Sequence, residues 1–445
     1  MYDLAIIGGG PAGYSAAYEA INANLSVVLF EKQDIGGTCL NRGCVPTKYL
    51  SHVARLYSDA KTSTVIEGDI RFNYGLAHSE MMHVISRLRS GITEGLTDRV
   101  TVIEGNAAIN DAQNVTCNGN KYEAKNILIA TGTAPIPCIL SSTPCLPRHL
   151  SSVISSDELL QMTESPAELH ILGGGSIAVE FANIFSALGA NVSIYIRGDR
   201  LLRTWDKEIA VGITQSFKKK GIKIYTKCDF SKLELQTGTI LSAMGRNPVL
   251  PQMPADLVEL KDGIVVSETG ETKTSHVYAA GDVIQNSPKL AHIAMEQGRN
   301  VVRHIIGEDI VRCNGNYNYN DKCNVIKCLY LDQEVASVGY TESKESKETK
   351  ESSVEIVTGK ATMYSNARTM ISTQERGFIK ISAEKHSGKI IGAQLMCERA
   401  SDLIAELALA INQGLTCKQM LHSIRPHPTY CEAVTEALTQ ICSNI

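Results

Sequence analysis

The chain has 445 residues, enough for two or three domains that each bury a core of their own. Its net charge of -4 at pH 7 gives no reason to expect nucleic acid or an anionic membrane as a partner. The 13 cysteines are odd in number and lack the spacing of a disulfide framework, so we expect a reducing compartment, the cytoplasm.

The chain opens with a predicted buried strand at 3–7, which leaves no room for a signal peptide. A glycine-rich turn, a helix of small residues from Tyr14 to about Ala23 and a second strand at 26–30 follow. No apolar run approaches the roughly 18 residues of a membrane-spanning helix. We therefore expect a soluble protein.

This first unit carries the complete pattern of a dinucleotide-binding site. Gly8, Gly10 and Gly13 stand at the spacing Gly-x-Gly-x-x-Gly between the strand and the helix, and Glu31 ends the second strand. Such glycines let the backbone approach a pyrophosphate at a helix N-terminus, and the glutamate can accept from a ribose hydroxyl. An ordinary glycine-rich turn is the alternative interpretation.

Residues 36–48 read Gly-Gly-Thr-Cys-Leu-Asn-Arg-Gly-Cys-Val-Pro-Thr-Lys. Cys39 and Cys44 can close a small disulfide if the backbone turns tightly, which the glycines and Pro46 permit. A helix predicted after Cys44 would favour the thiolate form of one sulfur. The stretch predicts a redox centre, with two reduced core thiols as the alternative. Another pair at this spacing, Cys323 and Cys328, lies in a predicted strand whose alternation separates the two sulfurs.

The elements that follow complete the first unit. We predict a helix at about 79–95, a strand at 100–104 and a strand at 125–130 that ends at Thr131-Gly132. Residues 141–156 are rich in serine and proline and predict a linker.

A second nucleotide-binding pattern begins after this linker. A strand at 169–172 leads into Gly173-x-Gly175-x-x-Ala178, a helix to Leu188 and a strand at 192–196. Two such units in one chain favour two different nucleotides. Between Gly221 and the turn at 244–248 only about two strands fit, so this second unit is expected to be short.

The residue after the last strand of the second unit indicates which nucleotide binds. An enzyme that prefers NAD should present a carboxylate there to the free ribose hydroxyls. This chain presents Arg197, and Arg203 follows six residues later. Guanidinium groups would pair with a 2'-phosphate, which predicts NADP. Solvated loop arginines are the alternative.

The last third of the chain changes from alternating strands and helices to strands with short connections. A strand at 277–280 ends in Gly281-Asp282, and Leu290-Ala291-His292 precedes a helix. Strands are predicted at 325–331 and 334–339, a hairpin at 378–382 and 389–395, and a helix at 400–414. Residues 342–352 alternate Lys, Glu and Ser and predict a solvated surface segment.

A second chemical signal lies near the C-terminus, in residues 425–432. His427 can take a proton from an attacking thiol, and Glu432 can fix its tautomer and stabilise its charged form. The spacing Thr429-x-x-Glu432 also matches a capping box that would open the last helix without any catalysis.

The run Gly-Gly-Thr-Cys-x4-Cys-Val-Pro-x-Lys and the motif His-Pro-Thr-x-x-Glu resemble those of the FAD-dependent pyridine nucleotide-disulfide oxidoreductases. The resemblance implies that Cys39 exchanges with substrate while Cys44 lies against the flavin. It implies that Lys48 sits by the flavin ring with Glu180 as its partner. It also implies that His427 is the acid/base and comes from the other subunit of a dimer.

The same resemblance implies two cofactor sites. The FAD site would be formed by Gly8, Gly10, Gly13, Glu31, Thr38, Lys48, Gly132, Asp282 and Ala291. The NADP or NAD site would be formed by Gly173, Gly175, Ala178, Glu180, Arg197, Arg203 and Gly245. No metal site is predicted.

The implied fold is α/β, with two Rossmann-type dinucleotide-binding domains and a C-terminal α+β dimerisation domain. We expect the FAD domain at 1–145 and 250–318, a shortened NAD(P) domain at 146–249 and an interface domain at 319–445. The first fingerprint, Leu-Ala-His and the C-terminus resemble the dihydrolipoamide dehydrogenase branch, whereas Ala178, Arg197 and Arg203 resemble the NADPH-dependent glutathione reductase branch.

From these features we expect a homodimeric dithiol/disulfide oxidoreductase of the dihydrolipoamide dehydrogenase type. Its substrate would be a small dithiol or disulfide, or a lipoyl domain. An NADPH-dependent reductase of low-molecular-weight disulfides is the alternative. A non-catalytic flavoprotein subunit is a third interpretation.

Overall fold

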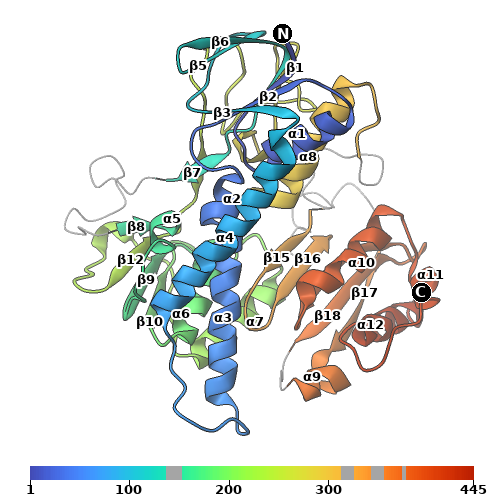
Figure 1. Cartoon of the computed structure of the whole chain (residues 1–445). Coiled ribbons are helices and arrows are strands. Elements are labelled where there is room, and N and C mark those ends of the chain that lie inside the picture. The colour runs from blue at the N-terminus through green and yellow to red at the C-terminus, as the bar shows by residue number, and fades with distance from the viewer. Residues whose placement is uncertain (137–152, 312–324, 342–354, 373–376) are drawn as a thin grey trace.

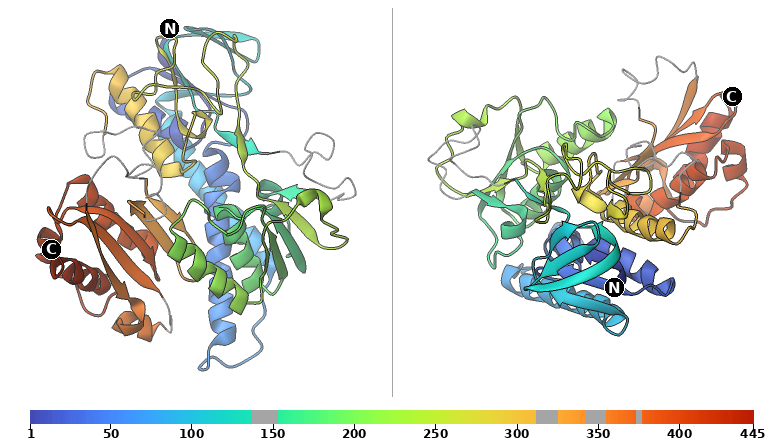
Figure 2. Two further views of the ribbon diagram at one scale, coloured as in Figure 1. Left: turned by 180° about the vertical axis from the view of Figure 1, so that it is seen from behind. Right: turned by 90° about the horizontal axis from the view of Figure 1, so that it is seen from above.

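The computed structural model describes residues 1–136, 153–311, 325–341, 355–372 and 377–445. Three sheets with their helices surround the centre of the molecule, where helices α2, α3 and α4 run between the N-terminal sheet and the second sheet (Figure 1). The two further views in Figure 2 show the C-terminal part as a separate lobe beside the other two. This is the mixed α/β architecture that the sequence predicted, and the fold class is confirmed.

The first sheet has seven strands in the order β3-β2-β1-β6-β5-β4, with β14 paired to β6. Strands β1, β2, β3, β6 and β14 are parallel, and in the centre Ala5 pairs with Val28 and Ile127. Since β14 joins from far along the chain, residues near Asp282 return to the N-terminal unit. The strands are β1 (Tyr2–Ile7), β2 (Val27–Glu31), β3 (Val100–Glu104), β4 (Ala108–Asp111), β5 (Asn114–Cys117), β6 (Asn120–Ile129) and β14 (Val277–Ala279).

Helices α1 (Pro11–Asn22) and α8 (Ala291–Ile305) pack against each other beside this sheet. Their backbones approach closely, because a Cβ placed on Gly298 would lie 2.1 Å from the carbonyl oxygen of Ala12. A side chain there would push the helices apart. This contact places the middle of α8 next to the first turn of α1, which follows the glycine-rich turn.

The redox stretch forms the short helix α2 (Gly37–Arg42) and the start of the long helix α3 (Cys44–Thr62). Helix α4 (Tyr74–Thr97) packs against both and is longer at each end than the predicted helix at 79–95. Its first turn is stabilised by Asn73, whose side chain accepts from the backbone N–H of Leu76 at 2.9 Å.

The second sheet is entirely parallel, in the order β11-β10-β9-β12-β8. Only two strands follow Gly221 in this sheet, as the sequence predicted. Its strands are β8 (Val153–Ser155), β9 (Glu168–Leu172), β10 (Asn191–Tyr195), β11 (Lys223–Tyr225) and β12 (Thr239–Ser242), and its helices are α5 (Ser156–Leu159), α6 (Ser176–Ala187) and α7 (Lys207–Lys219). A 3-10 turn, η1 (Phe230–Lys232), lies between β11 and β12.

A short antiparallel pair, β7 (Thr133–Pro135) and β13 (Arg246–Pro248), joins the two nucleotide-binding units. Thr133 pairs with Pro248 and Pro135 pairs with Arg246. The chain therefore leaves the first unit and returns to it along the same narrow connection.

The C-terminal sheet is antiparallel, in the order β15-β16-β19-β18-β17, and includes the predicted hairpin. Helix α10 packs on β16 and β19, and α12 packs on β17 and β18. The elements are β15 (Lys327–Leu329), β16 (Val335–Gly339), β17 (Ile356–Thr362), β18 (Phe378–Glu384), β19 (Ile390–Met396), α9 (Ala367–Ile371), α10 (Ala400–Asn412), α11 (Cys417–Leu421) and α12 (Glu432–Cys442), with a 3-10 turn η4 (Met363–Ser365). A further 3-10 turn, η2 (Gly281–Val283), belongs to the first unit, where it follows β14.

Some predicted segments differ or lie outside the described residues. Residues 153–155 of the predicted linker form β8, because they pair with β12, while 141–152 lie outside the described part. The predicted surface segment at 342–352 and Cys323 also lie outside it, and Cys328 is in β15 as expected. The domain limits stay a prediction.

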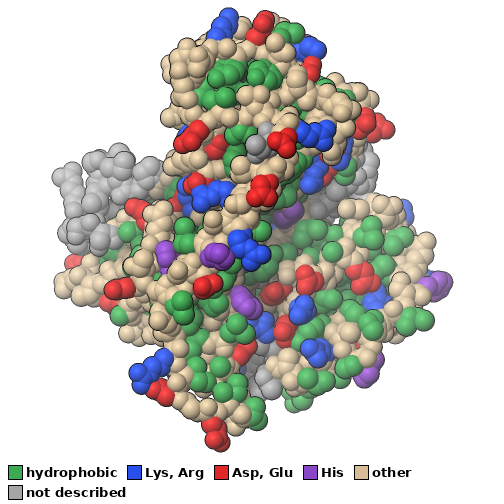
Figure 3. Space-filling view, in the orientation of Figure 1, with side chains coloured by type: hydrophobic (Ala, Val, Ile, Leu, Met, Phe, Trp, Pro, Cys, Tyr) green, Lys and Arg blue, Asp and Glu red, His purple; other side chains and the backbone are tan. Residues whose placement is uncertain are grey.

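Among the described residues, no helix has the length and apolar character needed to cross a membrane. Figure 3 shows acidic and basic side chains interspersed over one face of the molecule, with no large area of a single sign on that face.

Candidate active site

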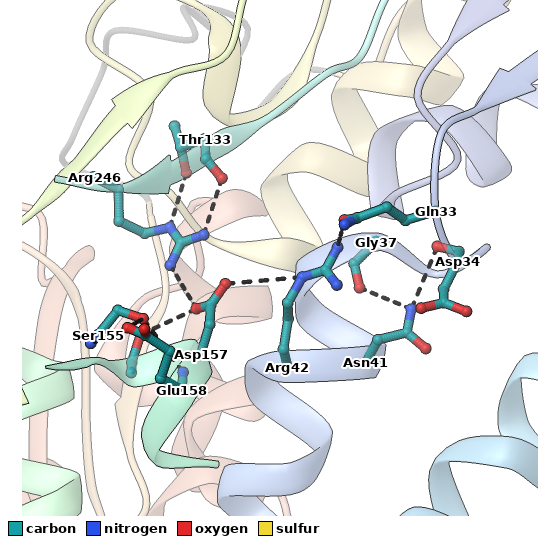
Figure 4. Close-up of polar contacts among 11 residues, drawn as sticks. Gln33, Asp34, Gly37, Asn41, Arg42, Thr133, Ser155, Asp157, Glu158 and Arg246 are labelled. Carbon is teal, nitrogen blue, oxygen red and sulfur yellow. Dashed lines mark hydrogen bonds and ion pairs between the residues drawn. The ribbon is translucent and has the colours of Figure 1, made fainter. Parts of the chain in front are cut away.

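Cys39 lies in α2 and Cys44 is the first residue of α3, and their sulfurs form a disulfide with the Cα atoms 4.7 Å apart. The side chain of Asn41 donates to the carbonyl oxygens of Ile35 and Gly37, each at 3.0 Å. Figure 4 shows the contact with Gly37. The position of Cys44 at a helix N-terminus, where backbone N–H groups face outward, favours a thiolate there. The predicted pairing of these cysteines is confirmed.

The disulfide lies on the wall of a cavity of about 900 Å³. Both nucleotide-binding units contribute to this wall, so a ligand of one unit can contact a ligand of the other. Of the predicted site residues, the following line the cavity: Gly8, Gly10, Glu31, Thr38, Cys39, Cys44, Lys48, Gly132, Gly175, Glu180, Gly245, Asp282 and Ala291.

The first glycine-rich turn has the conformation that its glycines require. Gly8 has φ +107°, and a Cβ on Gly13 would lie 1.9 Å from the carbonyl oxygen of Gly8. Gly10 precedes α1, and no side chain of the described chain caps that helix N-terminus. Glu31 is oriented by the backbone N–H groups of Gly9 (2.7 Å) and Gln33 (2.9 Å). An uncapped helix start that faces a cavity fits a pyrophosphate.

Lys48, on the first turns of α3, contacts Glu180 on α6. The ammonium nitrogen lies 2.8 Å and 3.0 Å from the two carboxylate oxygens, and this predicted pairing is confirmed. Tyr330, which the sequence analysis did not single out, donates its backbone N–H to Glu180 at 3.0 Å and places its ring 4.6 Å from the Lys48 ammonium. The cation is thus held at the junction of three segments.

Asp282 lies in η2, directly after β14 of the first sheet. Burial raises the pKa of its carboxyl group, and the cations Arg246 and Lys289 together with the Thr133 hydroxyl oppose that rise. Gly132 and Ala291 line the same cavity. Asp282 also lines this cavity, so its carboxyl group borders the site beside the first unit.

The second unit repeats the glycine geometry. Gly173 has φ +128°, and a Cβ there would lie 2.4 Å from the carbonyl oxygen of Ala243. Gly175 precedes α6, which no side chain of the described residues caps, and Ala178 is buried within that helix. Gly13, Gly173 and Ala178 do not line the cavity; they set the backbone around it.

Arg197 follows β10 and is exposed, with its guanidinium carbon 5.7 Å from the centre of the Phe230 ring. Arg203 is exposed as well, and its side chain runs beside Gly198, since a Cβ placed there would lie 3.0 Å from the Arg203 Cδ. The structure brings the two arginines to the same strand end. Neither lines the cavity that holds the disulfide.

A polar cluster that the sequence analysis missed connects the redox loop with the second unit (Figure 4). Asp157 lies between two guanidinium groups, 3.3 Å from Arg246 Nη1 and 3.8 Å from Arg42 Nε. Arg246 also donates to the hydroxyl (3.1 Å) and carbonyl (2.9 Å) oxygens of Thr133. The sequence could have indicated Arg42, because it stands between the two cysteines. No pattern in the sequence indicated Asp157.

His427 and Glu432 form a pair, with 2.8 Å between Nδ1 and Oε1. Glu432 also accepts from the backbone N–H of Thr429 at 2.8 Å, and this bond, followed by the contact with His427, lowers its pKa. The contact from Thr429 N–H to Glu432 is one half of a capping box, but the N-cap of α12 is Cys431 and no side chain of the described residues accepts from the first turn of this helix, so the alternative of a complete capping box is wrong.

The His427 side chain is 72 % exposed and does not line the cavity with the disulfide. Helix α12, which follows it, lies on the outer lobe, away from α2 in the centre of the molecule (Figure 1). One chain by itself therefore does not bring this imidazole to Cys39.

Comparison with known proteins agrees with this geometry. The sequence family of the pyridine nucleotide-disulphide oxidoreductases matches residues 2–298, and the family of their dimerisation domain matches residues 325–438. The dihydrolipoyl dehydrogenase of Mycoplasma genitalium is 32% identical and that of Bacillus subtilis is 30% identical, each over 98% of this chain and 97% of the relative.

Two solved structures are similar over nearly their whole length. LpdA from Mycobacterium tuberculosis has a TM-score of 0.86 at 23% identity and 99% coverage of both chains, which shows the shared fold. The flavoprotein disulfide reductase RclA from Escherichia coli has a TM-score of 0.85 at 25% identity, over 98% of this chain and 99% of that one. The chain belongs to the pyridine nucleotide-disulphide oxidoreductase family, whose enzymes use FAD and a pyridine nucleotide.

Proposed function

We propose that this enzyme oxidises a dihydrolipoyl dithiol to the disulfide and reduces a pyridine nucleotide, as a homodimer. The observation that carries the proposal is the Cys39–Cys44 disulfide on the wall of a cavity that both nucleotide-binding units line. Full-length relatives named dihydrolipoyl dehydrogenase support the choice of substrate. In the balanced reaction the dithiol loses two electrons and two protons, and the nucleotide takes up a hydride while one proton is released.

The cavity fits FAD. The uncapped N-terminus of α1 and Gly10, which lines the cavity, suit a pyrophosphate, Glu31 suits a ribose, and Asp282 suits a hydroxylated chain. Thr38, Lys48, Gly132 and Ala291 would complete this site. When bound, the flavin supplies two-electron transfer between a dithiol and a nicotinamide.

The chain's own residues carry out the thiol chemistry. A substrate thiolate attacks the Cys39 sulfur, the disulfide bond breaks, and Cys44 leaves as a thiolate that the N-terminus of α3 stabilises. The second substrate thiolate then displaces Cys39, and the substrate disulfide departs. The pair is left reduced by two electrons.

The protons need a base near Cys39. We propose that His427 of the partner subunit takes them, with Glu432 of the partner subunit orienting the imidazole. The exposure of His427 within one chain and the match to a dimerisation domain support this arrangement. Without this base, the rate of dithiol oxidation would fall, whereas hydride transfer between the flavin and the nucleotide would not.

A second part of the proposal concerns which pyridine nucleotide binds. Gly173, Gly175 and the start of α6 would hold its pyrophosphate, and Gly245 and Glu180 line the cavity that holds the disulfide. Arg197 and Arg203 favour a 2'-phosphate, so we propose that NADP is accepted beside NAD. The same arginines favour an NADPH-dependent disulfide reductase as the second candidate.

Steady-state rates separate the two candidates. We expect dihydrolipoamide to reduce NAD or NADP at least about a hundredfold faster than NADPH reduces oxidised glutathione, since productive positioning is worth that factor. Lipoamide activity at background level would overturn the proposal.

Seven free thiols among the described residues support a reducing compartment, the cytoplasm.

A further inference from the structure

Three residues connect the helix that begins at Cys44 with the loop that carries His427 in the same chain. We propose that Arg55, Glu398 and Tyr430 are positioning residues that hold the His427–Glu432 pair in place for the disulfide of the other subunit. This inference rests on the proposed function, because it requires that His427 acts as the base.

The first link leaves the redox helix. Arg55 lies on α3, about three turns after Cys44. Its Nη2 is 2.9 Å from Oε1 of Glu398, which stands between β19 and α10 in the C-terminal lobe. Both side chains are mostly buried, at 26% and 17% exposure, so solvent screens this pair less than a surface pair.

The second link reaches the histidine loop, residues 425–432. The other carboxylate oxygen of Glu398 accepts from the phenol of Tyr430 at 2.5 Å, and Oγ of Ser372 lies 2.9 Å from the same phenol. Burial, with a further contribution from the Glu398 bond, raises the pKa of Tyr430, so its hydroxyl is a donor at neutral pH. Arg368 places its guanidinium carbon 6.0 Å from the centre of this ring.

Other contacts hold the remainder of the loop. Asn366 donates to the Thr429 carbonyl oxygen at 2.9 Å and also caps α9. Arg425, whose side chain is 5% exposed, donates to Thr435 at 3.0 Å and pairs with Glu406. A loop with buried anchors thus presents an exposed imidazole.

This contrast is the reason for assigning a positioning role. Tyr430 is 6% exposed while His427, three residues earlier, is 72% exposed. Proton transfer requires both the exposed imidazole and the buried tyrosine. The imidazole must be accessible to the other subunit and held at a fixed angle, because small displacements of a catalytic group lower the rate. Because Arg55 belongs to the redox helix, the same contacts tie each disulfide to the base that serves the other subunit.

Tyr430→Phe in the full-length holoenzyme tests the loop side. We expect kcat for dithiol oxidation to fall at least about tenfold. The midpoint of the kcat/KM profile against pH should move to lower pH, because an imidazolium that loses its carboxylate neighbour is less stable. Tyr364→Phe, an exposed tyrosine of the same lobe, is the matched control. An unmoved profile in Tyr430→Phe would overturn the inference.

His427→Gln separates this inference from the proposed function. If His427→Gln keeps wild-type dithiol oxidation, the proposed function fails. If it loses activity while Tyr430→Phe retains both rate and pH profile, only the positioning role fails.

Mixed dimers test the helix side and do not depend on Tyr430. One subunit carries His427→Gln and the other Cys39→Ser, so a single centre remains, with its disulfide in the first and its base in the second. Arg55→Gln in the second subunit should lower kcat and move the pH profile. The same change in the first subunit should do neither. An effect in the first subunit equal to or larger than that in the second would show that Arg55 acts by supporting α3 beside the remaining disulfide, and the inference would fall.

Discussion

Nζ of Lys48 lies 2.8 Å from Oε2 of Glu180, although 132 residues separate them in the chain. The contact joins the redox helix α3 to helix α6 of the second nucleotide-binding unit. Glu180 is 8% exposed on its side chain, so its carboxylate is largely shielded from solvent and the Lys48 ammonium is its cationic neighbour. The pair fixes the disulfide relative to the second nucleotide-binding unit.

Lys48→Met should therefore reduce both stability and turnover. A nearly buried carboxylate without its cation costs about 3 kcal/mol, and turnover should fall because the cation borders the cavity. Denaturant unfolding and kcat measure the two effects. Lys61→Met, at the exposed end of the same helix, is the control, and equal unfolding midpoints for the two variants would contradict the prediction.

Cys39→Ser should abolish dithiol oxidation, by more than about a thousandfold, because no sulfur remains for the exchange. Cys228→Ser, a free thiol in the second unit, should keep wild-type rates. Turnover with dihydrolipoamide measures both. Residual activity of Cys39→Ser above a hundredth of wild type would argue for the non-catalytic interpretation of the disulfide.

Arg197→Glu should shift the nucleotide preference toward NAD. A charge-assisted bond to a phosphate is worth about 1.5–3 kcal/mol, so KM for NADP should rise about 10- to 100-fold while KM for NAD changes little. Lys223→Glu, exposed on the neighbouring strand β11, controls for the altered surface charge. An unchanged ratio of the two constants would exclude the phosphate contact.

Lys380→Met should destabilise the contact between the second unit and the C-terminal lobe. Lys380 Nζ lies 3.0 Å from Oδ2 of Asp206, and these side chains are 5% and 2% exposed. Removing the cation leaves a buried carboxylate, which costs about 3–5 kcal/mol, and adding Asp206→Asn should restore part of it. Lys385→Met, which breaks a much more exposed pair with Glu355, should leave the urea midpoint where it was.

Asp282→Asn should stabilise the flavin-free protein at neutral pH and weaken FAD binding. Burial raises the folded-state pKa of Asp282, so stability falls as pH rises from the unfolded-state pKa through the higher folded one. Each tenfold difference in the acid dissociation constant between the two states corresponds to about 1.4 kcal/mol, and asparagine escapes this loss. Unfolding from about pH 4 to pH 8 should show the two proteins diverging as pH rises; parallel curves would contradict it.

The predictable part of the fold and the site was local in the sequence. The strand–turn–helix units, the glycines whose Cβ atoms would collide with backbone, and the cysteines beside Pro46 all depend on neighbours within a few residues. The Lys48–Glu180 contact was expected only through the family resemblance, since no spacing relates those two positions. The prediction of a complete capping box at Thr429 was wrong, because α12 begins at Glu432 with Cys431 as its N-cap and only the Glu432 half of the box forms.

By itself the sequence determined the two dinucleotide-binding units, the redox pair and the α/β class, because backbone conformation and side-chain periodicity are short-range properties. Only the tertiary structure decided that β14 returns to the first sheet, that Asp157 meets Arg42 and Arg246, and that Glu398 joins Arg55 to Tyr430. It also decided that His427 is exposed and does not line the cavity of its own disulfide. Such contacts follow from the order of strands and the packing of helices, which bring distant residues together without leaving any pattern along the chain.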